Sequence, residues 1–210
     1  MTRIDDQLSE SHPHDRGVFF SDAVFAISMT LLAIEIRVPE SDIEAYGMYA
    51  ALLRLTPLFI AYAVSFLVTA LFWAQHMQTW KHVRHVTGSL LWLNTFQLMF
   101  VALVPFSSGL YAEHVGDNTA FAFYCLNLSG VALFAWLSRL YVIRHERLAE
   151  RLDAHEISWM KLRTLTSLLV FLACIPLAYW QPLLGRMGFV LIFILQALLK
   201  MHYRRKAVAA

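Results

Sequence analysis

Six runs of hydrophobic residues, separated by short polar connections, dominate the pattern along this chain. The runs lie at about 17–38, 48–74, 88–111, 119–143, 162–182 and 185–202. A transmembrane helix needs about 20 predominantly apolar residues, so each run is long enough to cross a bilayer. Pro39 and Gly47 interrupt the chain at the first joint, and Pro182 and Gly185 mark a very tight last one. The pattern therefore predicts an all-α, polytopic membrane protein with six transmembrane helices, the last two forming an antiparallel hairpin.

The polar residues between the runs predict the orientation and the boundaries. Cytoplasmic loops retain Lys and Arg, and six crossings put all but three of the 17 basic residues on one side, the exceptions being Arg37, Arg54 and Arg186. We therefore expect both termini in the cytoplasm and localisation in the cell (inner) membrane. Residues 1–15 are a polar segment to which no fold is assigned, 16–206 a single six-helix transmembrane domain, and 207–210 a tail.

The first run differs from the others because it carries ionisable residues at both ends. A charge in hydrocarbon costs at least a few kcal/mol, so such a residue marks a pathway or a buried pairing site. At about 100° per helical residue, one side of this run is a continuous apolar stripe within about 40° of Ile27. The apolar stripe consists of Phe20, Ala23, Ile27, Leu31, Ile34 and Val38. Ser21 and Asp22 lie about 120° to 140° from Ile27, so we expect them to bond to neighbouring helices.

The same run carries a motif. Arg16, Phe20, Ser21 and Asp22 form R-x-x-x-F-S-D, followed at once by AVFAI and then by TLL with an acidic residue. This motif resembles the first helix of the transmembrane-protein-175 potassium channels in their prokaryotic six-helix form. The resemblance implies a homotetramer in which the first helices of four subunits line a central pore.

The resemblance also implies roles for individual residues on the first helix. Bulky apolar side chains form the narrowest constrictions in that family, and the matching positions are Ile27, Leu31 and Ile34. Thr30, about 60° from Ile27, is the implied hydroxyl for potassium preference over sodium. The motif occurs once, and a single stripe cannot enclose a pore, so closed symmetric association is required. No run contains a Gly-rich filter sequence of ordinary potassium channels.

Polar residues at one membrane depth predict a structural clasp that holds the first helix in place. Polar groups at that depth must find partners. The clasp consists of Arg16, Phe20, Ser21, Asp22, Trp73, His76 and Asn94. Trp73 and His76 match the family's W-x-x-H-H element except for Met77 in its last place. A proton-sensing role for His76 is the alternative.

Glu35 and the aromatic residues near the predicted interfaces allow further expectations. Glu35 lies about 40° from Leu31, which puts it at the outer pore mouth, unless it forms an interfacial ion pair with Arg37 or Arg54. Aromatic residues at interfaces are typical belt anchors. Those expected here are Tyr46, Tyr49, Trp80, Trp92, Trp159, Tyr179 and Trp180. The connection 139–163 has helical spacing of its charges, so we expect a cytoplasmic extension of helices with a solvated charged face.

Composition excludes several classes of protein. With 59% hydrophobic and 15% charged residues, the chain is far more apolar than a soluble domain. The basic residues are not clustered, so no nucleic-acid partner is expected. The nine His residues lack companion ligands at metal spacing, so we expect no metal and no cofactor. Cys125 and Cys174 sit in apolar runs and are interpreted as small buried hydrophobes.

The patterns predict a polytopic membrane protein that associates symmetrically. The family resemblance further implies a homotetrameric, potassium-selective or potassium-preferring passive channel with potassium as its permeant ion and membrane lipid as its other contact. A secondary transporter remains the alternative and predicts broken helices in paired halves; Pro57, Pro105 and Pro176 interrupt runs without a two-fold correspondence. An enzyme is disfavoured, because Asp22 and His76 are the only candidates for catalysis at membrane depth and no motif unites them.

Overall fold

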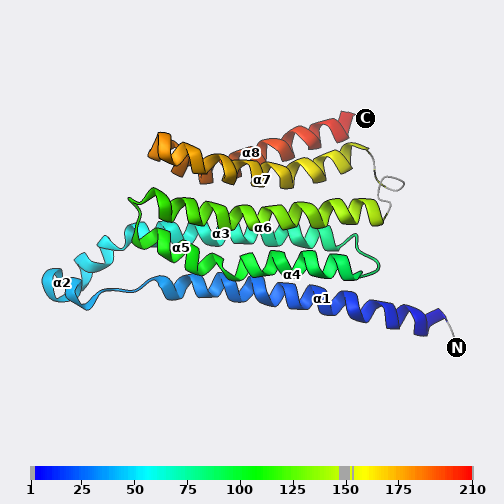
Figure 1. Ribbon diagram of the computed structural model, residues 1–210, viewed down its shortest axis with the longest axis horizontal. Helices are drawn as coiled ribbons and strands as arrows, with labels where there is room; N and C mark the ends of the chain where they lie inside the picture. The colour runs from blue at the N-terminus through cyan, green and yellow to red at the C-terminus, as the bar shows by residue number, and fades with distance from the viewer. Residues whose placement is uncertain (1–2, 147–151, 153, 210) are drawn as a thin grey trace.

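The computed structural model describes residues 3–146, 152 and 154–209, and this part of the chain is all-helical (Figure 1). Its elements are α1 (Arg3–Leu31), a 3-10 helix η1 (Leu32–Glu35), α2 (Glu40–Arg54), α3 (Thr56–Trp80), α4 (Gly88–Ala102), α5 (Val104–Glu113), α6 (Asn118–His145), α7 (Ala154–Trp180) and α8 (Pro182–Ala209). Arg147 and Arg151, which entered the charge count above, lie outside the described residues.

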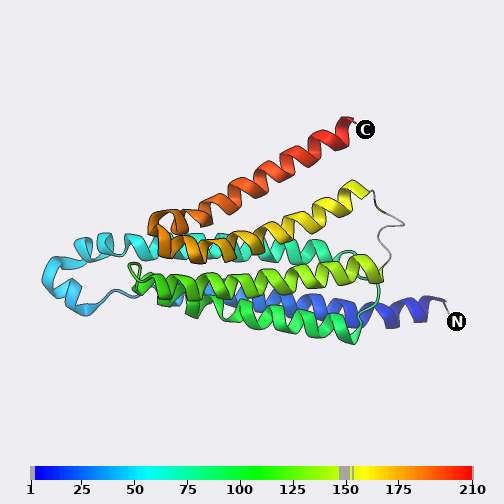
Figure 2. The ribbon, with the colours of Figure 1, turned by 45° about the horizontal axis from the view of Figure 1, so that its top comes forward.

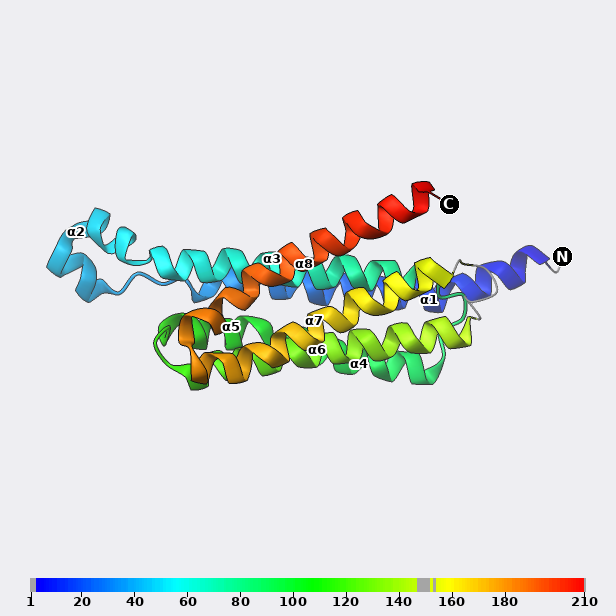
Figure 3. The ribbon, with the colours of Figure 1, turned by 90° about the horizontal axis from the view of Figure 1, so that it is seen from above.

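The helices run side by side along one long axis, with α1 at one edge and the pair α7 and α8 at the other (Figure 1). Between them, α6 packs against α4 and α7, and α2 projects beyond the other helices at one end. The N-terminal end of α1 and the C-terminal end of α8 lie at the opposite end, as Figure 3 also shows. Figure 2 shows α8 leaning away from the remaining helices toward its C-terminal end.

Five stretches of the described chain are long and apolar enough to cross a membrane. They are His14–Glu35, Glu40–Trp80, Gly88–Glu113, Asn118–His145 and Glu156–Trp180. Each overlaps most of one of the first five predicted runs, and α8 covers the sixth. Only Gln181 separates α7 from α8, and the two helices pack together. The predicted tight hairpin is thereby confirmed.

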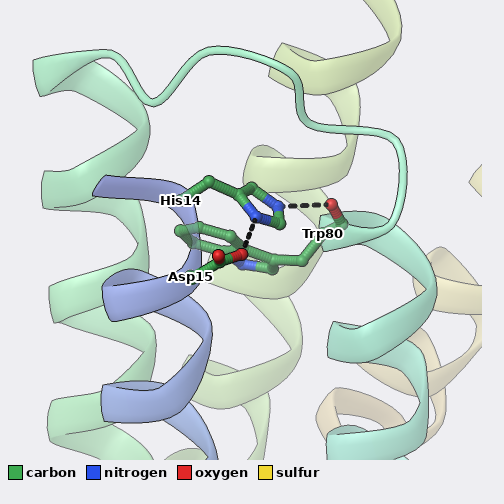
Figure 4. Close-up of polar contacts among 3 residues, drawn as sticks. All are labelled: His14, Asp15 and Trp80. Carbon is green, nitrogen blue, oxygen red and sulfur yellow. Dashed lines mark hydrogen bonds and ion pairs between the residues drawn. The ribbon is translucent and has the colours of Figure 1, made fainter. Parts of the chain in front are cut away.

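The start of α1 differs from the expected boundary, because the helix begins at Arg3 rather than near residue 16. His14 contacts the last residue of α3 (Figure 4): its Nε2 donates to the Trp80 carbonyl at 3.2 Å, and the two rings lie 5.9 Å apart. Its Nδ1 lies 3.3 Å from Asp15 Oδ1. The last carbonyls of a helix have no partner within it, and the Trp80 carbonyl accepts from Val83 N at 3.0 Å as well as from His14. The hydrophobicity pattern does not predict this contact between α1 and α3.

Two prolines divide long helices and free backbone carbonyls that side chains then satisfy. Proline has no N–H to donate to the carbonyl four residues earlier, so Pro57 and Pro105 leave the carbonyls of Leu53 and Val101 without that bond. Thr56 Oγ1 donates to Leu53 O at 2.6 Å within the same joint. Val101 O instead accepts from Ser28 Oγ of α1, at 2.8 Å. The break between α4 and α5 thus becomes a docking point for α1.

Arg139 joins three helices at the end of the bundle that carries the termini. Its side chain is almost completely buried, whereas the sequence pattern places it on a solvated face. The guanidinium donates to Gln75 O at 2.7 Å, to Thr79 Oγ1 at 2.9 and 3.1 Å, and to Met160 O at 2.9 Å. It forms no ion pair with a described carboxylate. Neutral acceptors on α3 and α7 therefore hold a buried charge on α6.

Replacing Arg139 with Ala should destabilise this end of the bundle. The change removes the guanidinium bonds to three buried acceptors together with a large side chain, so we expect a loss of about 3 kcal/mol. Thermal denaturation of the detergent-purified protein measures it. Arg144→Ala, an exposed change one turn further along α6, is the control and should stay within about 0.5 kcal/mol. Equal stability of the two variants would contradict the role given to Arg139.

Candidate functional site

The helix α1 has one buried face and one exposed face, and the exposed face is the candidate site. Ser21, Phe25, Ser28 and Leu32 are buried, with exposed fractions of 0, 0, 1 and 2%. Their spacing of three or four residues is that of one side of a helix. On the other side Phe20, Ala23, Ile27, Thr30, Leu31 and Ile34 are exposed. The division follows the wheel drawn from the sequence.

Small polar side chains bind the buried face of α1 to α4 and α3. Asn94 Nδ2 of α4 donates to Ser21 Oγ at 3.0 Å, and Ser21 in turn donates to the Gly17 carbonyl at 2.8 Å. Asp22 lies beside this contact and accepts from Trp73 Nε1 of α3 at 2.8 Å. In hydrocarbon each unsatisfied polar group costs several kcal/mol, so these bonds fix the rotation of α1.

Three members of the predicted clasp take other positions. His76 is buried between aromatic rings, with Phe25 and Trp80 each 5.5 Å away between centroids. Arg16 is exposed and has no ion pair among the described residues, and Phe20 is 60% exposed. The structure thus brings together Ser21 with Asn94 and Asp22 with Trp73, whereas Arg16 and Phe20 are exposed.

The exposed side of α1 carries three bulky apolar side chains and one hydroxyl. Ile27, Leu31 and Ile34 are 57, 40 and 56% exposed. Thr30 Oγ1 donates its proton to the Ile27 carbonyl at 2.8 Å. Because a hydroxyl has one proton and two lone pairs, this bond leaves only acceptor capacity for a group facing Thr30. Such an oxygen suits a cation.

The end of α1 tightens, and this changes the direction of Glu35. From Leu32 the chain forms η1, which turns through three residues rather than 3.6. The Glu35 carboxylate lies against α5, where an added Cβ on Gly109 would be 2.8 Å from Oε2. Arg54 instead pairs with Asp42 at 3.6 Å. Glu35 forms no ion pair with Arg37 or Arg54 in the described chain.

Sequence reasoning missed three residues that hold α1 in place. Phe25 is fully buried in the main core, and Ser28 bonds to the Val101 carbonyl. Pro105 was the available signal for Ser28, since it leaves a carbonyl that needs a donor. Trp80 was interpreted as a belt anchor but is 1% exposed, enclosed by His14 and His76. Sequence periodicity does not predict that Trp80 is buried, because its contact with His14 joins residues far apart in the chain.

Comparison with known proteins identifies related chains. The family model described as endosomal/lysosomal potassium channel TMEM175 matches residues 16–105. A potassium channel of Streptomyces collinus is 40% identical over 118 residues, which is 54% of this chain and 57% of that one. A potassium channel of Chamaesiphon minutus is 34% identical over 143 residues, covering 66% and 70%. The human endosomal/lysosomal proton channel TMEM175 is 37% identical over 105 residues, 47% of this chain and 21% of its own.

One solved structure is similar over nearly the whole chain. It is the crystal structure of a lysosomal potassium-selective channel TMEM175 homolog from Chamaesiphon minutus, with a TM-score of 0.77 and 24% identity. The likeness covers 91% of this chain and 98% of that chain. The fold is therefore the same. The matched proteins are ion channels rather than enzymes.

Replacing Trp73 with Phe tests how Asp22 acts. The change removes the indole donor and leaves an acceptor unsatisfied, at a cost of about 1 kcal/mol or more. Asp22→Ala should also lower stability, and the double variant should lose less than the sum, because both changes break one bond. Thermal denaturation and size-exclusion chromatography of each variant measure this, with the exposed Trp92→Phe as control. Additive losses, or a stable Asp22→Ala oligomer altered only in conductance, would place Asp22 on the ion path instead.

Proposed function

Because this chain belongs to the TMEM175 potassium channel family, we propose that it forms a passive, potassium-selective or potassium-preferring channel. The relation to the Chamaesiphon potassium channel, 34% identical over 70% of that protein, carries the family assignment. The protein is a multi-pass membrane protein in which residues 16–206 form a single channel domain. Potassium crosses down its gradient, and no cofactor takes part.

The exposed stripe on α1 is the observation that supports a pore between subunits. One chain contributes one such face, so a closed ring of identical chains is needed to enclose a path. Four copies in a homotetramer are the number that the family resemblance favours. The edge position of α1, opposite α7 and α8 (Figure 1), lets four α1 helices meet at a common axis. An apolar face would also suit contact with lipid. The conductance measurements on Ile27→Asn distinguish a pore-lining face from a lipid-facing one.

We place six crossings in the cell (inner) membrane with both termini in the cytoplasm. An even number of crossings agrees with the N-terminal end of α1 and the C-terminal end of α8 lying at the same end of the bundle (Figure 3). The excess of Lys and Arg in the connections at that end supports its cytoplasmic orientation.

Ions would pass rings of Ile27, Leu31 and Ile34, which form the constriction. Narrow apolar pores dewet readily, so these rings also act as the gate. The Thr30 hydroxyl, one position before Leu31, offers lone pairs to a partly dehydrated potassium ion, since its proton is held by the Ile27 carbonyl. Glu35 lies against α5 but stays partly exposed at the end of the stripe, so we retain it as an outer-mouth residue, where four carboxylates would raise the local concentration of cations.

Two other functions compete with this proposal. A secondary transporter is one, and proton conduction is the second, because the human relative is named a proton channel. For protons His76 is the obvious titratable group, but its burial between Phe25 and Trp80 favours a structural role. Planar-bilayer recording of the purified protein decides: many ions per opening indicate a channel, and reversal potentials under separate potassium and pH gradients identify the ion.

Ile27→Asn should increase single-channel conductance, because a polar side chain in the constriction favours a wetted pore. Recording in symmetric potassium measures it. Leu169→Asn is the matched control: the same change at an exposed position of α7, distant from the proposed pore, should leave conductance unchanged. An assembled Ile27→Asn channel with wild-type conductance would remove Ile27 from the constriction.

Thr30→Ala should weaken the discrimination of potassium from sodium, whereas Thr30→Ser, which keeps the hydroxyl, should retain it. Reversal potentials under bi-ionic conditions give the permeability ratio. Thr95 is a matched control on α4, since it is also exposed and donates to a carbonyl of its own helix, Leu91 O, at 2.8 Å. If Thr30→Ala and Thr95→Ala both match the wild type, Thr30 has no part in selectivity.

A further inference from the structure

A cavity of about 370 Å³ lies between α3, α5, α6 and α8, at the end of the bundle remote from the termini. Its volume falls within the range of about 300 to 1,000 Å³ that is typical of small-molecule sites. Ile60, Ala61 and Val64 of α3 supply apolar lining, and Tyr111 and Arg186 line the same cavity. The cavity is separate from the exposed face of α1 that forms the proposed pore.

The polar groups of the cavity are unequally satisfied. Ser65 accepts from Tyr124 OH at 2.8 Å and lies 2.6 Å from Ser108 Oγ, so the hydroxyls at the inner end bond to one another. Arg186 is the one charged residue in the described lining. Its Nε is buried without a hydrogen-bond partner, and its guanidinium forms no ion pair within the described chain. A buried donor left unsatisfied costs about 1–3 kcal/mol, so this group needs a ligand.

The position of Arg186 is set by close packing of the preceding residue. An added Cβ on Gly185 would lie 2.7 Å from the Ala178 backbone, so glycine allows the first turn of α8 to rest directly on α7. This contact holds the start of α8, and with it Arg186, beside the cavity. The guanidinium is therefore part of a built site and not a side chain on a free surface loop.

The chemistry of the cavity selects among possible occupants. A free phosphate would meet apolar walls on most sides and lose its hydration without compensation. A neutral lipid chain would fill the apolar space and leave the guanidinium unpaired. Arginine recognises phosphate through two parallel hydrogen bonds. An anionic amphiphile would pair its charged group with the Arg186 guanidinium and place its apolar part against the apolar lining of the cavity.

The surroundings favour a lipid of the bilayer as the source. Leu183, Leu184 and Met187, which flank Arg186 on α8, are 69, 50 and 53% exposed. These apolar side chains suit contact with hydrocarbon. The helix lies across the bundle from α1 (Figure 1), which puts it on the periphery of a tetramer built around α1. Only this last step rests on the proposed function.

We propose that this cavity binds one anionic phospholipid, with the phosphate on Arg186 and part of an acyl chain against Ile60, Ala61 and Val64. The lipid belongs to the leaflet opposite the side on which the termini lie. It wedges α8 against α3 and α5, and so supports the peripheral helices without entering the ion path.

Native mass spectrometry of the purified oligomer, offered equal amounts of phosphatidylglycerol and phosphatidylcholine, tests the site without any need for current. The wild type should retain phosphatidylglycerol preferentially. Arg186→Gln should reduce the preference about fivefold, the effect of one basic residue near a membrane surface, and Arg186→Lys should keep it in part. Arg37→Gln removes the same charge at an exposed position outside the cavity lining and should retain the wild-type preference.

A cavity-filling variant separates the site from a general charge effect. Ala61→Phe leaves Arg186 in place but occupies the acyl space, so it should also lose the preference, with the elution volume of the oligomer confirming assembly. An unchanged preference in Arg186→Gln or in Ala61→Phe overturns the proposal, as does an equal loss in Arg37→Gln. Competition by soluble glycerol phosphate as effective as that by phosphatidylglycerol would identify a free-anion site and overturn the assignment to lipid. Loss of potassium current in every preparation would refute the channel and leave this binding result standing.

Discussion

The need to satisfy every polar backbone group in hydrocarbon determines how α1 sits in this protein. Water cannot reach such groups, so a carbonyl freed by proline must find a donor within the chain. Pro105 frees the Val101 carbonyl, and Ser28 supplies the hydroxyl. Two turns earlier Ser21 accepts from Asn94. These bonds lie on one side of α1, so they determine which side of the helix stays exposed.

The exposed side of α1 has the character that the proposed pore requires. Side chains committed to internal hydrogen bonds cannot also face an ion, and α1 separates the two tasks by rotation about its axis. The buried side uses small hydroxyls that allow close packing, a pattern common between membrane helices. The exposed side carries bulky branched residues and one hydroxyl whose proton is already used. The hydrogen bonds on the buried side of α1 therefore orient its exposed side, although none of the atoms that form them lies on that exposed side.

The all-helical architecture and the buried side of α1 could be predicted from the sequence, because both depend on local periodicity. Ser21 and Asp22 point toward α4 and α3 as the wheel required. The wheel does not describe Glu35, since η1 turns more tightly per residue and the Glu35 carboxylate lies against Gly109. Contacts that join distant parts of the chain had no periodic signal. The sequence predicts Arg139 to be one more cytoplasmic basic residue. In the structure it donates to three acceptors on α3 and α7.

The way α1 is held also bears on the choice between a channel and a carrier. Alternating access moves one group of helices against another around a fixed site. Here Ser21 and Ser28 tie α1 to α4 at two depths, and Asp22 ties it to α3. A rocking motion that separated α1 from α4 would break the Ser28–Val101 and Asn94–Ser21 hydrogen bonds in hydrocarbon, where lost polar contacts are costly. Helices joined in this way move as one unit. This coupling of α1 to α3 and α4 supports the fixed apolar path that we propose along the exposed face of α1.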